Sequence, residues 1–378
     1  MKNFWMKLEK PFFALAPMAG YTDQPFRLMC KKYGADVLYS EMVSSEAIWH
    51  NKLKVESEKC KIKVSLRDNL YKTLKLIQFS RFEQLFVVQI FGSNPEHMAL
   101  SAEYIATGEW YEDYLQLITS NLQQATKEKK LKVDNRKLNV TSIPAGIDVN
   151  MGCPVHDVTK LGSGAALLKN PKLASVIIKS IKKKVKNIPI SVKTRLGWDN
   201  PKEILTFARM LEYCGADAIA IHGRTYRQGF SGEVDWEMIE KVKKQVKIPV
   251  IGNGDLGKLK IESEKCKIKV SLRDIINNKL DGYMIGTGAL GRPWVFEKLK
   301  IESEKCKIKV SLRDDYNFIK QNILEHARLN QEIKGERSVV EFRKHIAWYL
   351  KGLPNISNLR AKLVRIESYN ELENYLKY

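Results

Sequence analysis

The sequence lacks the cysteine patterns that bind zinc or form a disulfide framework. Its six cysteines include no Cys-x-x-Cys pair and no grouping with histidine, so no metal is expected and a reduced, cytoplasmic setting is favoured. No apolar run approaches the length of a membrane span, and residues 1–10 lack the apolar segment of a signal peptide. The Gly-x-x-x-x-Gly-Lys-Ser/Thr pattern of a P-loop is also missing, which argues against ATP as a ligand.

Positive charge, by contrast, is abundant. The chain has 64 Lys and Arg residues against 43 Asp and Glu residues, a net charge of +21. Such an excess predicts a polyanionic partner. With 378 residues, the chain is long enough for one large α/β domain and a small appendage.

Three nearly identical segments interrupt the chain, at residues 52–68, 258–274 and 298–314. Their spacing is irregular, which excludes a solenoid. We interpret them as in-frame insertions that resemble the mobile palindromic elements of some bacterial genomes. Each copy carries six Lys or Arg residues and three Asp or Glu residues, so the remainder of the chain is less basic but still clearly so. Their apolar pattern fits an exposed strand or one helix face. We expect solvated surface insertions; an RNA-contacting arm is the alternative.

Outside these repeats, short β-rich runs alternate with helical stretches. Eight runs precede residue 297, at residues 12–19, 37–43, 86–92, 146–152, 190–197, 218–224, 249–255 and 282–288. The alternation predicts parallel βα units, and their number predicts an α/β fold of the TIM (β/α)8 type over residues 1–297. The long third connection is expected to contain a helix over residues 111–130, and the second repeat could supply part of the seventh helix or leave that helix disrupted.

The end of the chain has a different pattern. After the linker formed by the third repeat, helical periodicity over residues 316–334, 339–350 and 359–378 predicts a small all-helical C-terminal domain over residues 315–378. Its many basic side chains form either a solvated helix face or a nucleic-acid surface.

Polar residues gather at the predicted carboxyl ends of the strands, where TIM barrels place their active sites. Cys153 follows the fourth run, and its thiol could donate or accept a proton, attack an electrophile, or only fill space. Lys193 lies within the fifth run, where a buried cation needs an anionic or electron-rich partner; a structural ion pair is the alternative. Gln89 offers both a donor and an acceptor to the imide edge of a ring. His222 could bind the same ligand or hold a neighbouring loop.

Glycine-rich turns follow the last two runs, as Asn253-Gly254-Asp255 and Gly286-Thr287-Gly288. In TIM barrels these two loops commonly bind a phosphate group through backbone N–H groups. A mononucleotide cofactor therefore fits better than a dinucleotide, although the glycines could also serve tight turns alone.

These motifs together resemble the tRNA-dihydrouridine synthases, flavin enzymes that reduce uridine in transfer RNA. The matching stretches are Ala16-Pro17-Met18-Ala19-Gly20 with Thr22-Asp23, Ser40-Glu41-Met42, Val88-Gln89, Asp148-Val149-Asn150-Met151-Gly152-Cys153-Pro154, Val192-Lys193-Thr194-Arg195, Ile221-His222-Gly223-Arg224-Thr225, Asn253-Gly254-Asp255 and Gly291-Arg292-Pro293-Trp294. In the C-terminal region, Arg343-Lys344-His345-Ile346-Ala347-Trp348-Tyr349-Leu350 resembles the bacterial B-type branch.

The resemblance implies a cofactor, a reaction and a set of site residues. FMN would be reduced by NADPH and would deliver hydride to C6 of uracil, while Cys153 protonates C5. Asn150 and Arg224 would contact the substrate, and the helical domain would bind tRNA. The residues expected to hold FMN are Pro17, Met18, Ala19, Gln89, Lys193, His222, Asn253, Gly254, Asp255, Gly286 and Thr287.

Two other functions remain open at this point. One is a different FMN barrel that acts on a free pyrimidine, of the dihydroorotate dehydrogenase class. The other is a tRNA-binding protein without activity, whose site was damaged by the insertions.

Overall fold

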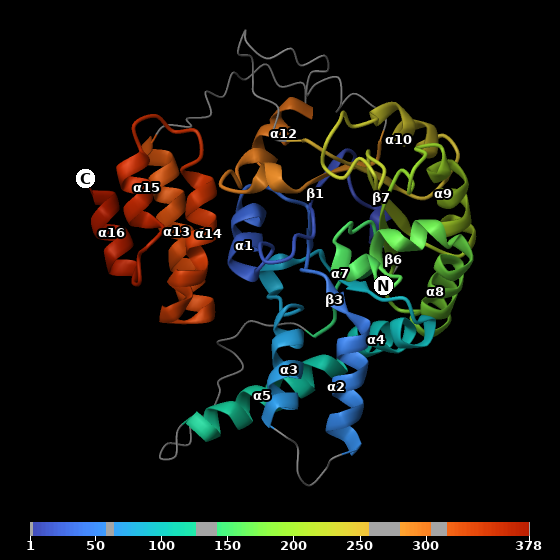
Figure 1. Cartoon of the computed structure of the whole chain (residues 1–378), viewed down its shortest axis with the longest axis horizontal. Helices are drawn as coiled ribbons and strands as arrows, with labels where there is room; N and C mark the ends of the chain where they lie inside the picture. The colour runs from blue at the N-terminus through green and yellow to red at the C-terminus, as the bar shows by residue number, and fades with distance from the viewer. Residues whose placement is uncertain (1–2, 58–63, 126–141, 257–279, 304–315, 378) are drawn as a thin grey trace.

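The computed structural model describes residues 3–57, 64–125, 142–256, 280–303 and 316–377. Its centre is a closed parallel barrel, as the alternating pattern predicts (Figure 1). The strands are β1 (Phe12–Leu15), β2 (Val37–Tyr39), β3 (Val43–Ser44), β4 (Phe86–Phe91), β5 (Gly146–Met151), β6 (Ile190–Arg195), β7 (Ala218–His222), β8 (Val250–Asn253) and β9 (Gly282–Ile285). Their order is β2-β1-β9-β8-β7-β6-β5-β4-β3, and a further β2–β4 pairing closes the ring.

The second predicted run forms two short strands rather than one. Strand β2 pairs with the first half of β4, and β3 pairs with the second half of the same strand. Together β2 and β3 fill one strand position, so the barrel has the predicted eight strand positions. Nearly all strand side chains are buried, because a parallel barrel has side chains inside and helices outside.

Helices surround the barrel and form the C-terminal region (Figure 1). Those around the barrel are α1 (Gln24–Lys32), α2 (Ser45–Ser57), α3 (Val64–Lys75), α4 (Pro95–Thr107), α5 (Glu109–Ala125), α7 (His156–Thr159), α8 (Pro171–Lys184), α9 (Glu203–Tyr213), α10 (Trp236–Lys243) and α12 (Val295–Ser303). The C-terminal helices are α13 (Tyr316–Lys334), α14 (Val339–Tyr349), α15 (Ser357–Leu363) and α16 (Tyr369–Lys377). None of the described helices combines the length and the apolar character needed to cross a bilayer.

Two helix predictions differ from the structure in their bounds. In the third connection, α4 ends at Thr107, and the φ of 83° at its C-cap Gly108 lets the chain turn into α5. Helix α5 therefore begins two residues before the predicted start at Tyr111. The region from 359 onward forms two helices instead of one. Here the Arg343 guanidinium donates hydrogen bonds to the carbonyl oxygens of Arg365 and Ile366, and these bonds hold the bend between α15 and α16.

The described parts of the repeats are helical. Residues 52–57 complete α2, residues 64–68 begin α3, and residues 298–303 complete α12. The predicted domain boundary after residue 297 therefore falls inside a helix. The second copy, and with it the question of the seventh helix, lies outside the described residues.

The C-terminal helices have a core of their own, which includes Trp294 from the barrel side and Ile323, Phe342, Ile346 and Leu372. Gly291, which precedes α12, lies directly against the backbone of α14. It has a φ of 69°, and a Cβ at this position would overlap Trp348 and Tyr349. Position 291 therefore has no room for a side chain between the barrel and the helical domain.

Replacing Gly291 by alanine should therefore destabilise the protein by about 2–4 kcal/mol, from backbone strain and overpacking together. Urea unfolding of the full chain measures this change. The control is Gly335→Ala, at a φ of 88° with nothing within 4 Å of the added Cβ. We expect the control to lose only about 1 kcal/mol; equal losses in both variants would contradict the predicted overlap.

Candidate active site

The carboxyl ends of the strands surround one cavity of about 340 Å³, within the usual range of ligand pockets. Strand register explains why their side chains meet. Lys193 lies opposite Asn150 of β5, and His222 of β7 lies opposite Asn253 of β8. Every predicted site residue lines this cavity: Pro17, Met18, Ala19, Gln89, Asn150, Cys153, Lys193, His222, Arg224, Asn253, Gly254, Asp255, Gly286 and Thr287.

A chain of hydrogen bonds fixes the amide side chains on one wall. Gln89 Nε2 donates to Asp148 Oδ2 at 2.7 Å, and Asn150 Nδ2 donates to Gln89 Oε1 at 2.9 Å. Asp148 also accepts from the Ser191 hydroxyl at 2.6 Å. Burial raises the pKa of Asp148 to about 6, although both hydrogen bonds oppose the rise. The buried carboxyl group thus determines how Gln89 presents its amide.

The loop that carries Cys153 is held from both sides. Asn150 Oδ1 accepts hydrogen bonds from the backbone N–H groups of Gly152 and Cys153, at 3.1 and 2.9 Å. The Cys153 carbonyl oxygen accepts from the Ala165 N–H at 3.0 Å. The thiol is half-buried at the cavity wall. Asn150, predicted as a substrate contact, therefore also positions the cysteine, and its Nδ2 lies 3.6 Å from Met42 Sδ on the cavity wall.

Lys193 supplies a positive charge to the cavity. Within the described part of the chain, its ammonium makes no hydrogen bond and no ion pair. Burial lowers the pKa of Lys193 to about 8, with a further lowering by Arg195 and an opposing effect of Asp148. The structural ion pair that the sequence left open is thus not formed among these residues, and the cation is available to a ligand.

Arg224 follows β7, the strand next to that of Lys193, and is engaged within the protein. Its guanidinium donates to the Gly232 carbonyl oxygen at 2.6 Å and forms an ion pair with Asp255. Asp255 has a φ of 50° and Gly254 a φ of 136°, an arrangement that bends the chain immediately after β8. Arg224 was predicted to contact the substrate; its visible contacts stabilise the loops after β7 and β8.

Several cavity residues are absent from the predicted set. Arg195 donates to the carbonyl oxygens of Gly152, Thr225 and Gly229, and so ties the cysteine loop to the loop after β7. Phe230 is 72% exposed, with its ring 5.3 Å from the Arg195 guanidinium carbon. The remaining additions are mostly apolar: Ala16, Met42, Gly152, Pro154, Val155, Leu256, Met284 and Gly288. Arg195, a charged residue at a strand end, carried a chemical signal that could have identified it.

Comparison with known proteins identifies relatives over nearly the whole chain. The sequence profile of the dihydrouridine synthase family matches residues 14–113 and 109–377. The tRNA-dihydrouridine synthase B of Pasteurella multocida is 32% identical over 372 residues, covering 95% of this chain and 92% of that protein. A probable tRNA-dihydrouridine synthase of Rickettsia bellii is 33% identical over 353 residues, covering 92% and 88%.

Proposed function

The chain belongs to the dihydrouridine synthase family, and we propose that it reduces uridines of transfer RNA to 5,6-dihydrouridine with FMN as cofactor and NADPH as reductant. The observation that carries the proposal is that one cavity holds both Cys153, in the loop after β5, and Lys193 of the neighbouring strand β6, whose ammonium has no partner among the described residues. Members of the family share the FMN cofactor, and B-type relatives match this chain over both the barrel and the helical region.

The residues of the cavity suit a flavin mononucleotide. The Lys193 ammonium can stabilise negative charge on a ring, and Gln89 is fixed in one orientation by Asp148, so that it can bind an imide edge. The residues that would hold the cofactor are Pro17, Met18, Ala19, Gln89, Lys193, His222, Asn253, Gly254, Asp255, Gly286 and Thr287. When bound, reduced FMN supplies the hydride that C6 of the uracil receives.

Cys153 completes the reduction as a general acid. Saturation of the C5–C6 double bond requires one hydride and one proton, and the thiol S–H donates the proton to C5. The resulting thiolate takes up a proton from solvent before the next turnover. Asn150 holds the backbone of Cys153 in place and, as a residue that lines the cavity, would contact the uracil. A uridine folded into tRNA has to be extruded to reach a cavity at the barrel mouth.

The helical domain is the proposed tRNA-binding part. Support comes from basic side chains that are exposed on α14 to α16 and the segments around them, namely Arg337, Lys351, Arg360, Lys362 and Arg365. Arg343 is different, because its guanidinium is engaged by backbone carbonyl oxygens. We also propose a cytoplasmic location, which is supported by the free thiols of Cys30, Cys153 and Cys214.

A direct assay separates this proposal from its alternatives. Unmodified tRNA is incubated with the full chain, FMN and NADPH, and dihydrouridine is measured in the digested nucleosides by mass spectrometry. We expect dihydrouridine to accumulate in tRNA, and no turnover of free dihydroorotate. Turnover of dihydroorotate without tRNA product would support the other flavin barrel. A purified chain that binds tRNA but neither retains nor takes up flavin would indicate an inactive binding protein.

A further inference from the structure

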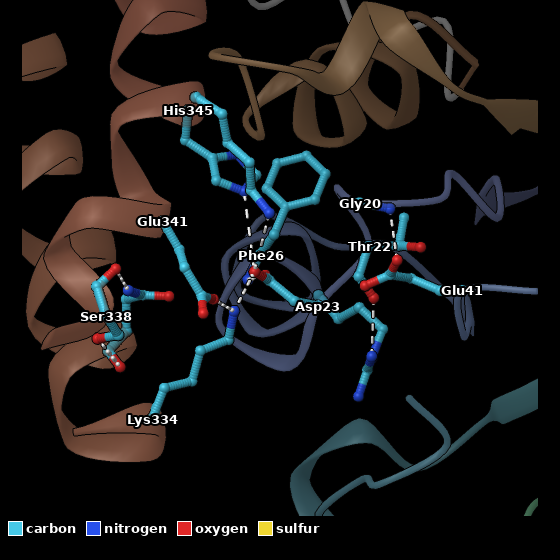
Figure 2. Close-up of polar contacts among 12 residues, drawn as sticks. Gly20, Thr22, Asp23, Phe26, Glu41, Lys334, Ser338, Glu341 and His345 are labelled. Carbon is cyan, nitrogen blue, oxygen red and sulfur yellow. Dashed lines mark hydrogen bonds and ion pairs between the residues drawn. The ribbon is translucent and has the colours of Figure 1, made fainter. Parts of the chain in front are cut away.

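Asp23 joins the barrel to the helical domain through a buried ion pair. As the N-cap of α1, it accepts a hydrogen bond at Oδ1 from the Phe26 N–H at 3.2 Å. Its Oδ2 accepts from the Lys334 ammonium at the end of α13, at 2.7 Å. The two side chains are only 9% and 11% exposed. Figure 2 shows Lys334 and His345 of the helical domain directed toward Asp23, with Glu341 beside Lys334.

Among the groups around the Asp23 carboxylate, the Lys334 ammonium is the nearest positive charge. His345 Nε2 is 4.0 Å from Asp23 Oδ2, and Lys344 Nζ is 3.8 Å away. Burial lowers the pKa of His345 to about 4 and that of His326 well below its usual value, so both rings are neutral. The imidazoles and Asp23 could together coordinate a divalent cation. However, the Lys334 ammonium already occupies the carboxylate oxygen that such an ion would need.

The loop before Asp23 forms one wall of the cavity, through residues 16–19. The Met18 N–H donates to Thr22 Oγ1 at 3.1 Å, and the Thr22 N–H donates to the Met18 carbonyl oxygen at 3.0 Å. Glu41 accepts from the Gly20 N–H (Figure 2), and Arg27 donates to the Thr22 carbonyl oxygen at 2.8 Å. Asp23, the next residue, therefore attaches the helical domain to this loop, and the Tyr21 ring, 5.8 Å from that of His345, also contacts the domain.

We propose that Lys334 is a positioning residue for the cofactor site: through Asp23, it holds the loop of residues 16–23 in the conformation that lines the cavity. Lys334 itself does not line that cavity. Attachment of the helical domain and binding of the cofactor are then coupled, and the coupling is reciprocal. The inference rests on the proposed function in one respect, that FMN is the ligand of the cavity.

The test compares FMN affinity among variants of the full chain. Lys334→Gln and Asp23→Asn each remove one charge of the pair, and asparagine keeps the helix cap. We expect the dissociation constant for FMN, from quenching of flavin fluorescence, to rise by about 5- to 150-fold in each. The double variant should lose no more than either single one, because both changes remove the same interaction. Lys334→Arg keeps the charge and should largely restore the affinity.

The matched control is Lys32→Gln. Lys32 of α1 pairs with Glu325 of α13 and so also bridges the two domains, but its side chain is exposed and it stands at the last residue of α1, whereas Asp23 caps the first turn. We expect this variant to bind FMN like the unaltered chain. Unchanged FMN affinity in folded Lys334→Gln and Asp23→Asn would overturn the proposal, as would an equal loss in the Lys32 control.

A second readout does not depend on the cofactor. Amide hydrogen exchange of residues 18–22 should be faster in Lys334→Gln than in Lys32→Gln, because the loop has lost its attachment. Unaltered exchange there would also overturn the proposal. If the unaltered chain bound no FMN while this exchange difference persisted, the proposed function would fail and the positioning role of Lys334 would stand.

Discussion

Replacing Cys153 by alanine is expected to slow the formation of dihydrouridine by about 100- to 10 000-fold, which is the usual contribution of a positioned general acid. FMN binding should persist in this variant. The loop is held by backbone groups, the N–H and the carbonyl oxygen of Cys153, and alanine retains both. The change therefore removes the proton donor and leaves the walls of the cavity in place.

Single-turnover experiments with pre-reduced enzyme measure this effect most directly, because they exclude the NADPH step. Dihydrouridine is quantified in tRNA at fixed times, and FMN content is measured in parallel. Cys214→Ala is the matched control, since Cys214 is a free, buried cysteine at the end of α9, with its sulfur 3.1 Å from the Ser175 hydroxyl. We expect the control to react at the normal rate. Normal activity of Cys153→Ala would exclude the thiol as the proton donor.

The sequence predicts the barrel well because a parallel barrel leaves a strong local signal. Its strands are buried on both faces and appear as continuous apolar runs, each ending in polar residues. All eight predicted runs contain a strand, or in one case a pair of short strands. The short polar segment 40–42 separates β2 from β3, and the apolar pattern on either side gives no indication of this break.

Interactions between distant residues leave no such signal. Asp148 reads as one polar residue in an apolar run, and only the fold reveals that it orients Gln89. The partners of Arg224 and Lys334 likewise depend on how loops and domains meet. Lys334 lies 311 residues from Asp23, and charge patterns in a sequence do not predict pairs at that distance.

The second large effect is expected at Lys193, where stability and cofactor binding should change in opposite directions. The Lys193 ammonium has lost solvation in the cavity and has no partner in the part of the chain that the structure describes, which is why its pKa falls to about 8. Lys193→Met removes the charge and keeps much of the apolar stem. We expect the apoprotein to gain stability at pH 7 on the order of 1–3 kcal/mol. FMN affinity should fall by about 10- to 100-fold, because a charge-assisted hydrogen bond is lost.

The lowered pKa of Lys193 also fixes the direction in which the stability of the apoprotein changes with pH. In the unfolded chain Lys193 has the ordinary lysine pKa of about 10.4, whereas in the native chain its pKa is about 8. Between these values the unfolded state binds more protons, so Lys193 makes the stability of the apoprotein rise as the pH increases through this window. In Lys193→Met this contribution is absent, and the difference in stability between the two proteins should shrink from pH 8 to pH 10.5.

Urea unfolding at several pH values, with and without saturating FMN, measures both halves of the effect. Without FMN, Lys193→Met should be the more stable protein; with FMN, the unaltered chain should gain more stability, because it binds the ligand more tightly. Lys179→Met, on the exposed face of α8, is the control and should change neither quantity. A Lys193→Met apoprotein that is less stable at pH 7 would mean that the ammonium has a stabilising partner within the protein. Cofactor binding would then have to be assigned to the other cavity residues.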